Sequence, residues 1–231
     1  MDTLETLQQI AQSVAGCQKC PLHQKRIRAV PGEGPASAEI MLIGEGPGRN
    51  EDEQGRPFVG NSGRFLTELL AKAGLKRSDV FICNVVKCRP PENRDPEPAE
   101  ILACRPYLEA QITALNPKVI ITLGRHSMGH FLSQARISVI HGRPVKAGGR
   151  LIIPMYHPAA ALHQPALKDD LLADFARVPA ILANGGTLPP EPAPAPAALP
   201  ASPEPAISPP PTAQPALPEK KDEGLVQLTL F

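Results

Sequence analysis

The sequence predicts an α/β fold with three layers, in which a four-stranded parallel sheet lies between helices and a disordered tail rich in proline and alanine follows. Two observations lead to this prediction. Short apolar segments alternate with segments whose apolar residues have helical spacing, as far as residue 186. Between residues 187 and 218 the composition changes, and this stretch carries 13 of the 29 prolines.

Four short apolar segments have the length and composition of buried strands. They cover residues 39–45, 80–86, 118–124 and 150–158. Each is rich in isoleucine, valine or leucine and has no polar alternation, which is typical of strands buried on both faces of a parallel sheet.

Five segments between and around these strands are expected to be helices. They cover residues 4–14, 62–75, 97–115, 125–133 and 165–184. The second has a plausible N-terminal cap at Asn61 or Ser62 and a stop at Gly74, and the third contains an internal proline.

The composition divides the chain into three parts. Residues 1–186 form the predicted folded domain, and residues 187–224 are a linker that has too few apolar side chains to offset the entropy of ordering. Residues 225–231 read "LVQLTLF" and are expected to be a separate peptide for contact with a partner.

Composition also indicates the environment. No apolar run reaches the ~18 residues of a membrane span, and no basic segment precedes an apolar one at the start, so we expect a cytoplasmic, nucleoid-associated monomer without a membrane partner. Up to residue 186 there are 22 basic and 18 acidic residues, which is weakly favourable for an anionic partner.

Four unusual segments fall at the ends of the four predicted strands. They are "GEGPG", Asn84, "GRHS" and "HP". Because ligands bind beyond the carboxyl ends of parallel strands, these segments are expected to meet at one site. No G-x4-G-K-[ST] motif occurs, so the sequence excludes a P-loop nucleoside triphosphatase.

Five cysteines in a chain without a secretion signal favour metal binding over disulfides. Cys17 and Cys20 form C-x2-C, whereas Cys88 and Cys104 are separated by a proline-rich loop. Four such thiolates could bind zinc or a [4Fe–4S] cluster, and the wide second spacing favours the cluster. Cys83 lies within a predicted strand and is expected to be a core residue.

Several of these segments together resemble one known family. "GEGPGRNEDEQGRPFVGNSG", "NVVKCRPPENRDP", the first cysteine pair and "HPAA" resemble the family 4, or iron–sulfur, uracil-DNA glycosylases. The resemblance implies a four-stranded parallel sheet between helices and excision of uracil from DNA, which starts base excision repair. It also implies that the four cysteines hold a structural [4Fe–4S] cluster.

The resemblance assigns a uracil pocket to the first two loops. Phe58 is expected to stack on the flipped base, and the amide of Asn84 can accept from uracil N3–H and donate to O4. Cytosine presents the opposite pattern and would leave buried groups unpaired. Backbone N–H groups of Gly44, Glu45 and Gly46 are expected near the same base.

The resemblance also assigns the catalytic groups. His157 is expected to donate to uracil O2 as negative charge develops there. A carboxylate should stabilise the cationic sugar and orient water, and we expect Glu45 at the pocket and Glu51 for the water, with Asp52 behind them.

Other residues are expected to contact the DNA. Leu162 is the predicted wedge that fills the gap of the flipped base, and His163 stands where family members often have arginine. Four basic residues are expected to contact phosphates, namely Lys87, Arg89, Arg94 and Arg125.

The final residues "QLTLF" resemble the peptide by which bacterial repair proteins bind the sliding clamp. Gln227, Leu228, Leu230 and Phe231 carry this resemblance. The alternative is an apolar end that folds back on the domain.

Two other functions remain compatible with the residues alone. One is an iron–sulfur DNA-binding redox or sensing protein without glycosylase activity. The other is a zinc-bound DNA-binding module that recruits the clamp. The sensing protein would release no base from DNA, whereas the glycosylase would. The zinc-bound module would lack the broad visible absorption of an iron–sulfur cluster.

Overall fold

The computed structural model describes residues 2–188 of the 231 in the chain. The predicted linker, apart from its first two residues, and the predicted clamp peptide at 225–231 lie outside the described residues. The described residues therefore cover nearly all of the predicted folded domain, residues 1–186.

The sheet has five strands in the order β2-β1-β3-β5-β4. Four are parallel and correspond to the predicted strands: β1 (Ile40–Gly44), β2 (Phe81–Asn84), β3 (Val119–Leu123) and β5 (Arg150–Met155). The fifth, β4 (Val145–Ala147), pairs antiparallel with β5 at the edge. The prediction of four strands was wrong by this one strand, which has only three residues and no buried apolar face to mark it.

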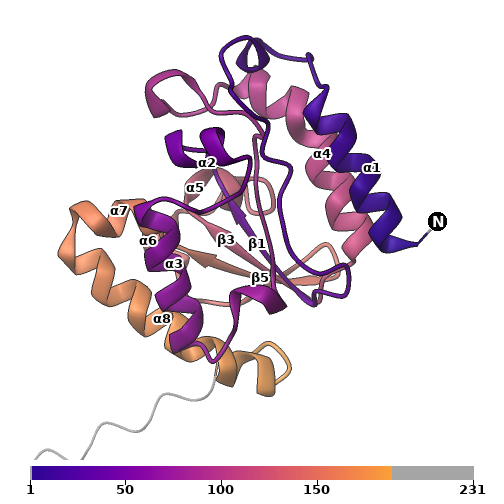
Figure 1. Cartoon of the computed structure of the whole chain (residues 1–231). Helices are drawn as coiled ribbons and strands as arrows, with labels where there is room; N and C mark the ends of the chain where they lie inside the picture. The colour runs from indigo at the N-terminus through magenta and orange to yellow at the C-terminus, as the bar shows by residue number, and fades with distance from the viewer. Residues whose placement is uncertain (1, 189–231) are drawn as a thin grey trace, which may run out of the picture. The chain divides into compact units, whose positions relative to one another are not determined.

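The parallel strands send alternate side chains to opposite faces, and both faces are buried. On one face, Leu42, Ile82 and Ile121 pack in a core built with α3 (Asn61–Lys72) and α8 (Pro165–Ala183). On the other face, the core is built with α1 (Thr3–Ala15) and α4 (Pro98–Leu115). Figure 1 shows α1 beside α4 on one side of the sheet and α3 beside α8 on the other. The three-layer α/β/α prediction is confirmed.

The remaining helices are short. They are α2 (Arg49–Gln54), α5 (Arg125–Gly129), α6 (Ile137–Ile140) and α7 (Pro158–His163). Single 3-10 turns occur at Pro21–Gln24, Arg77–Asp79 and Pro91–Asn93. Several helix boundaries differ from the prediction. The helix α3 begins at Asn61, with Gly60 as its N-cap, and ends at Lys72, and α5 ends at Gly129 rather than at residue 133.

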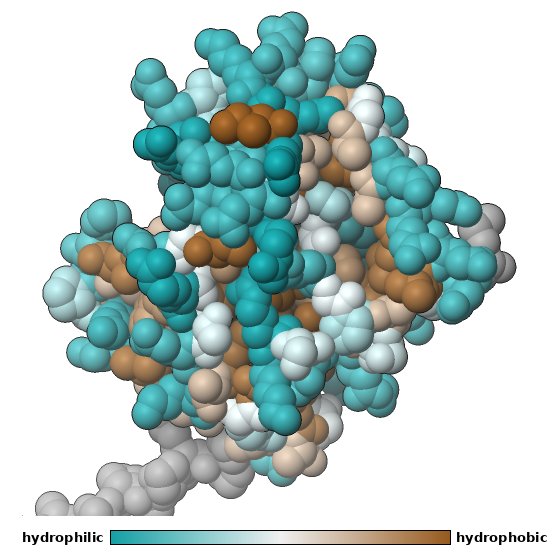
Figure 2. All heavy atoms as spheres, viewed as in Figure 1, coloured by the Kyte–Doolittle hydropathy of each residue, from teal (hydrophilic) through white to brown (hydrophobic). Residues whose placement is uncertain are grey.

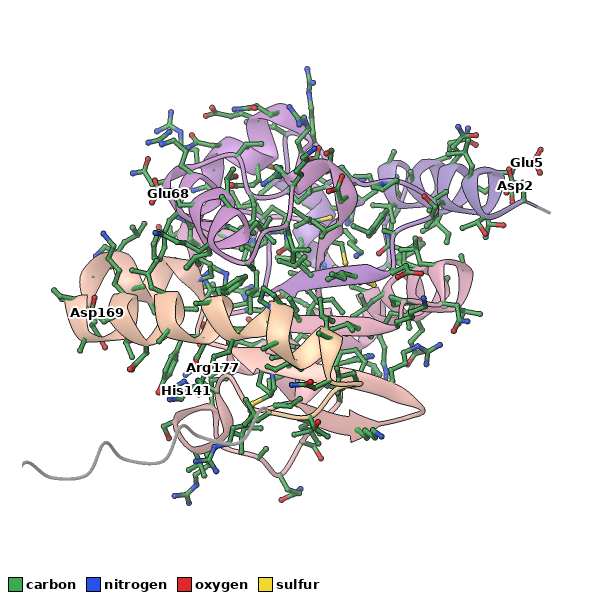
Figure 3. The ribbon with its side chains drawn as sticks, turned by 90° about the horizontal axis from the view of Figure 1, so that it is seen from below. Asp2, Glu5, Glu68, His141, Asp169 and Arg177 are labelled. Atoms are coloured by element: carbon green, nitrogen blue, oxygen red, sulfur yellow. The ribbon has the colours of Figure 1, made fainter. Side chains whose placement is uncertain are left out.

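A buried carboxylate fixes the loop between α6 and β4. Asp174, on α8, is 1% exposed, and its Oδ2 lies 2.7 Å from His141 Nδ1, while its Oδ1 accepts from Arg177. Figure 3 shows His141 and Arg177 next to one another beside α8. The following Gly142 has φ +66°, and a Cβ there would lie 2.1 Å from Asp174 Oδ1, so this loop requires glycine.

The surface of the domain is mainly hydrophilic on the face seen in Figure 2, with small, separate hydrophobic patches. Among the residues that the structure describes, no helix is both long and apolar enough to cross a membrane.

Candidate active site

A cavity of about 360 Å³ lies at the carboxyl ends of the parallel strands. Six of the predicted site residues line it, namely Glu45, Gly46, Glu51, Phe58, Asn84 and His157. The sequence reasoning did not assign seven other residues to its wall, which are Pro47, Gly48, Ser62, Pro90, Asn93, Arg94 and Ala159. The loops after β1 and β5 and the last residue of β2 supply the predicted residues, as the parallel topology requires.

Phe58 forms an apolar wall of this cavity and lies over Gly44 at the end of β1. A Cβ on Gly44 would lie 2.6 Å from the Phe58 ring, so this position requires glycine. Phe58 has φ 50°, which is rare for a residue with a side chain, and its ring centroid lies 5.7 Å from that of His157 in a stacked arrangement. The wall can stack a planar ligand.

The amide of Asn84 provides an unused acceptor inside the protein. Asn84 ends β2 and is 1% exposed, and its Oδ1 has no hydrogen-bond partner among the described residues. A buried polar atom without a partner costs free energy, and such an atom in a cavity is satisfied when a ligand donates to it. The Asn84 side chain also requires glycine at position 44, because a Cβ there would lie 2.4 Å from Asn84 Oδ1.

His157 is the N-cap of α7, and its Nδ1 accepts a hydrogen bond of 3.1 Å from the backbone N–H of Ala159. An accepting Nδ1 leaves the ring proton on Nε2 and defines the neutral tautomer. Burial lowers the pKa of His157 to about 4, and the charge on Glu51 opposes this shift. At neutral pH the side chain is therefore an uncharged donor.

Glu51 is held by the backbone around it. Its oxygens accept from the N–H groups of Gly48 at 3.1 Å, Val59 at 2.9 Å and Gly60 at 2.9 Å, and the residue is only 8% exposed. These bonds fix the loop between β1 and α3. Asp52 accepts hydrogen bonds from the backbone N–H groups of Ile27 at 3.0 Å and Arg28 at 3.4 Å. It therefore stabilises the segment that contains these two residues.

Glu45 is the least constrained carboxylate in the cavity. Burial raises the pKa of its carboxyl, His126 lowers that pKa, and Asp95 raises it again. His126 Nε2 lies 3.7 Å from Glu45 Oε2 and 3.6 Å from Asp95 Oδ2. Arg125 also bonds Asp95. The sequence reasoning noted the loop "GRHS" after the third strand but gave His126 no role.

A reaction that uses the Glu45 carboxylate should become faster as pH rises and this group ionises, with a midpoint above the usual glutamate pKa of about 4.3. His126→Ala should move this midpoint to higher pH, because it removes a group that lowers the pKa of Glu45. Asp95→Asn should move it to lower pH, because it removes one that raises that pKa. Single-turnover rates between pH 4 and 8 would measure both shifts, and movement in the same direction would contradict this account.

The prediction that Lys87 contacts phosphate was wrong. Lys87 is 1% exposed, and its Nζ donates to Asn84 O at 2.8 Å and to Gln111 Oε1 at 2.6 Å. The three arginines predicted with it bond residues of the chain itself: Arg89 with Asn93, Arg94 with Glu100, and Arg125 with Asp95. Their contact with phosphate stays a prediction.

Leu162 lies on α7, five residues after His157, and is 47% exposed. An exposed leucine on the helix that His157 begins can reach a DNA partner, so the wedge stays a prediction that the geometry permits. Cys83 is fully buried in β2, as expected for a core residue.

The four other cysteines approach one another from three segments of the chain. Burial raises the pKa of Cys104 to about 11; Lys87 opposes the rise, and charges on Cys88 and Cys20 add to it. Burial also raises the pKa of Cys88, Arg26 opposes this, and charges on Cys20 and Cys17 add to it. Each of these two thiols therefore lies within electrostatic range of other cysteines of the set.

Three N–H groups donate to sulfur in this region. Arg26 Nη1 lies 3.1 Å from Cys88 Sγ, the Lys87 backbone N–H 3.3 Å from Cys104 Sγ, and the Lys19 backbone N–H 3.5 Å from Cys17 Sγ. Hydrogen bonds to sulfur are typical of thiolates that bind a metal or a cluster. The donor set therefore fits a group that four thiolates hold.

The fold and the cavity define a class of protein. A parallel sheet presents, beyond its carboxyl ends, an aromatic wall, an unpaired amide oxygen and a neutral imidazole, which suit a planar ligand with hydrogen-bonding edges, such as a nucleobase.

Comparison with known proteins agrees with that class. The Uracil DNA glycosylase superfamily matches residues 31–177. The type-4 uracil-DNA glycosylase of Sulfurisphaera tokodaii is 48% identical over 185 residues, which is 76% of this chain and 84% of that protein. That of Thermotoga maritima is 42% identical over 187 residues, 79% of this chain and 97% of that protein. The chain belongs to the uracil-DNA glycosylase superfamily, in its type-4 branch.

Proposed function

We propose that this protein is a uracil-DNA glycosylase, which hydrolyses the N-glycosidic bond of uracil in DNA and leaves an abasic site for base excision repair. The buried Oδ1 of Asn84, which has no hydrogen-bond partner within residues 2–188, carries the proposal, because it can accept from uracil N3–H in a cavity that Phe58 and His157 also line. Cytosine has no N3–H and would leave this oxygen unpaired. The names of the type-4 relatives support the same activity.

The reaction begins when the base leaves the DNA stack and enters the cavity. Phe58 stacks on it and Asn84 holds its edge. As the bond between C1′ and N1 breaks, its electron pair passes to the uracil ring. Nε2–H of His157 donates to O2, and the backbone of Gly44, Glu45 and Gly46 lies close to the base. A neutral donor is sufficient for this, since no proton has to leave His157.

The sugar becomes cationic as the base leaves. Glu45 is the carboxylate that we assign to stabilise this charge and to accept the proton of the attacking water. Glu51 keeps the loop of Gly48 and Gly60 in place, and its negative charge at the cavity wall favours the cationic sugar as well. In this assignment Glu51 contributes to orienting the water but exchanges no proton.

The test of the proposal is a labelled duplex with a single uracil, incubated with the protein and then treated with alkali. A cut at the uracil is the expected result. Intact strands after incubation of single-stranded and double-stranded substrate with folded protein would overturn the proposal. That outcome would favour the redox or sensing protein without glycosylase activity.

We further propose that Cys17, Cys20, Cys88 and Cys104 hold a [4Fe–4S] cluster that orders the loops around the site. The wide sequence spacing of Cys88 and Cys104 and the three N–H groups that donate to sulfur support this proposal. About four iron and four sulfide per chain with broad visible absorption are expected, whereas zinc in a colourless protein would contradict the cluster.

The sliding clamp is the partner that we propose for residues 227–231. The motif supports this through its glutamine and its apolar anchors Leu228, Leu230 and Phe231. A linker of this length before such a peptide would raise the effective concentration of the enzyme at the clamp.

Deletion of residues 227–231 should abolish capture of the protein on immobilised bacterial clamp. Excision from a short duplex should be unchanged, since the deleted residues are far in sequence from the cavity. Substitution of Thr229 alone, which is not an anchor, is the matched control and should retain binding. Undiminished capture of the deleted protein would refute the assignment of the clamp peptide.

A further inference from the structure

Lys87 is a buried cation that the assigned mechanism does not use. It is 1% exposed and among the largest side chains that the protein buries completely. No carboxylate pairs with it among the residues that the structure describes. An unpaired ion inside a protein is costly and is retained only where hydrogen bonds and nearby charge support it.

The ammonium is joined to the residue that binds the base. Its Nζ donates to the backbone carbonyl of Asn84 at 2.8 Å and to Gln111 Oε1 at 2.6 Å. Gln111 is 2% exposed, and its Nε2 donates in turn to Pro31 O at 2.7 Å. A chain of hydrogen bonds therefore connects the end of β2 to α4 and to the segment before β1.

The backbone of Lys87 connects the same region to the cysteine loop. Its N–H donates to Cys104 Sγ at 3.3 Å, its carbonyl accepts from Val30 N–H at 2.7 Å, and Cys88 is the next residue. Lys87 thus connects the cysteine loop, through its backbone, to the end of β2, through its side chain, and two acceptors hold its ammonium group.

We propose that Lys87 is a positioning residue for base excision, whose buried ammonium fixes the Asn84 backbone and sets a positive potential behind the uracil as it becomes an anion. This inference rests on the proposed function. The electron pair of the broken C1′–N1 bond is delocalised over N1, O2 and O4 of the departing base, and the attacking water supplies the new bond at C1′. Lys87 gives up no proton and touches no reacting atom. A fixed charge in a medium of low dielectric constant can stabilise an anion without touching it.

The test varies the leaving group. 5-Fluorouracil forms a more stable anion than uracil because fluorine withdraws electrons, so its departure needs less help from positive charge. Single-turnover excision of each base from the same duplex should be measured for the wild type, Lys87→Met and Gln111→Glu. The second variant retains the lysine and the shape of residue 111, but it adds a negative charge that cancels the potential.

Lys87→Met should slow uracil excision on the order of tenfold to a hundredfold and 5-fluorouracil excision clearly less. Gln111→Glu should show the same pattern. Ile112→Ala, beside Gln111, is the matched control, because it removes buried volume without changing charge. It should lower the melting temperature and affect both substrates by one common factor.

Equal slowing of both bases in Lys87→Met and Gln111→Glu would reduce Lys87 to a purely structural role and overturn the proposal, as would unchanged rates in both variants. If Lys87→Met does not fold, Gln111→Glu decides alone. A wild type that releases neither base would instead refute the glycosylase function, so the two failures are distinguishable.

Discussion

His157→Ala should reduce the single-turnover rate of uracil excision by ~10²–10³-fold, which is the usual cost of removing one donor to a developing oxyanion. The backbone N–H of Ala159 occupies Nδ1, so Nε2–H is the only donor of this ring. Burial, the larger influence on its pKa, lowers that pKa to about 4. The ring is therefore neutral above about pH 5, and no change in rate from its titration is expected between pH 5 and 9.

The control for this variant is His130→Ala, which removes a histidine outside the cavity. It should retain the wild-type rate, and both proteins should retain the brown colour if the cluster is present. A His157→Ala rate within about twofold of wild type would remove His157 from the mechanism, while loss of colour would indicate a wider structural effect.

Asn84→Asp should lower uracil excision on the order of a hundredfold or more, since it replaces an amide donor by a second acceptor. The side chain is 1% exposed, so a carboxylate there would be desolvated and would face uracil O4 without a hydrogen. Rates on a duplex with one uracil, measured with enzyme in excess, separate this loss from weaker DNA binding.

Asn61→Asp is the matched control, because it makes the same chemical change at the first residue of α3 outside the cavity wall. A carboxylate at a helix N-terminus is favourable, and the rate should stay within about twofold of wild type. If Asn84→Asp were equally mild, the uracil edge would be read by some other group.

Local patterns were sufficient to predict the layers of this fold. Apolar segments of strand length and helices with clear stops specify alternating elements, and the carboxyl ends of parallel strands must share one edge. That topology is why Asn84 and His157, which are 73 positions apart in the sequence, could be expected in one cavity. The three-residue β4 lacks both length and an apolar face, so only its pairing with β5 reveals it.

The roles of the side chains that were misread or missed depend on how deeply each one is buried and on which residues surround it. Neighbouring residues in the sequence do not determine this. In the sequence, Lys87 stands next to Cys88 and Arg89 and looks like a surface charge. Gln111, on a helix that comes later in the chain, provides an acceptor that allows the lysine to be buried. Glu51 was expected to orient water and this stays a prediction, but the three backbone N–H groups that it also accepts from could not be read from the sequence. His126 gains its significance only because Glu45 and Asp95 come within 4 Å of it.

The most direct test of the central claim is to measure the free base released from two duplexes that differ only in having uracil or cytosine at one position. The account predicts stoichiometric release of uracil, with an abasic site left in an otherwise intact strand, and no detectable release of cytosine. Release of both bases at similar rates would contradict reading of the base by Asn84. Release of neither base, from folded protein, would contradict the glycosylase function itself.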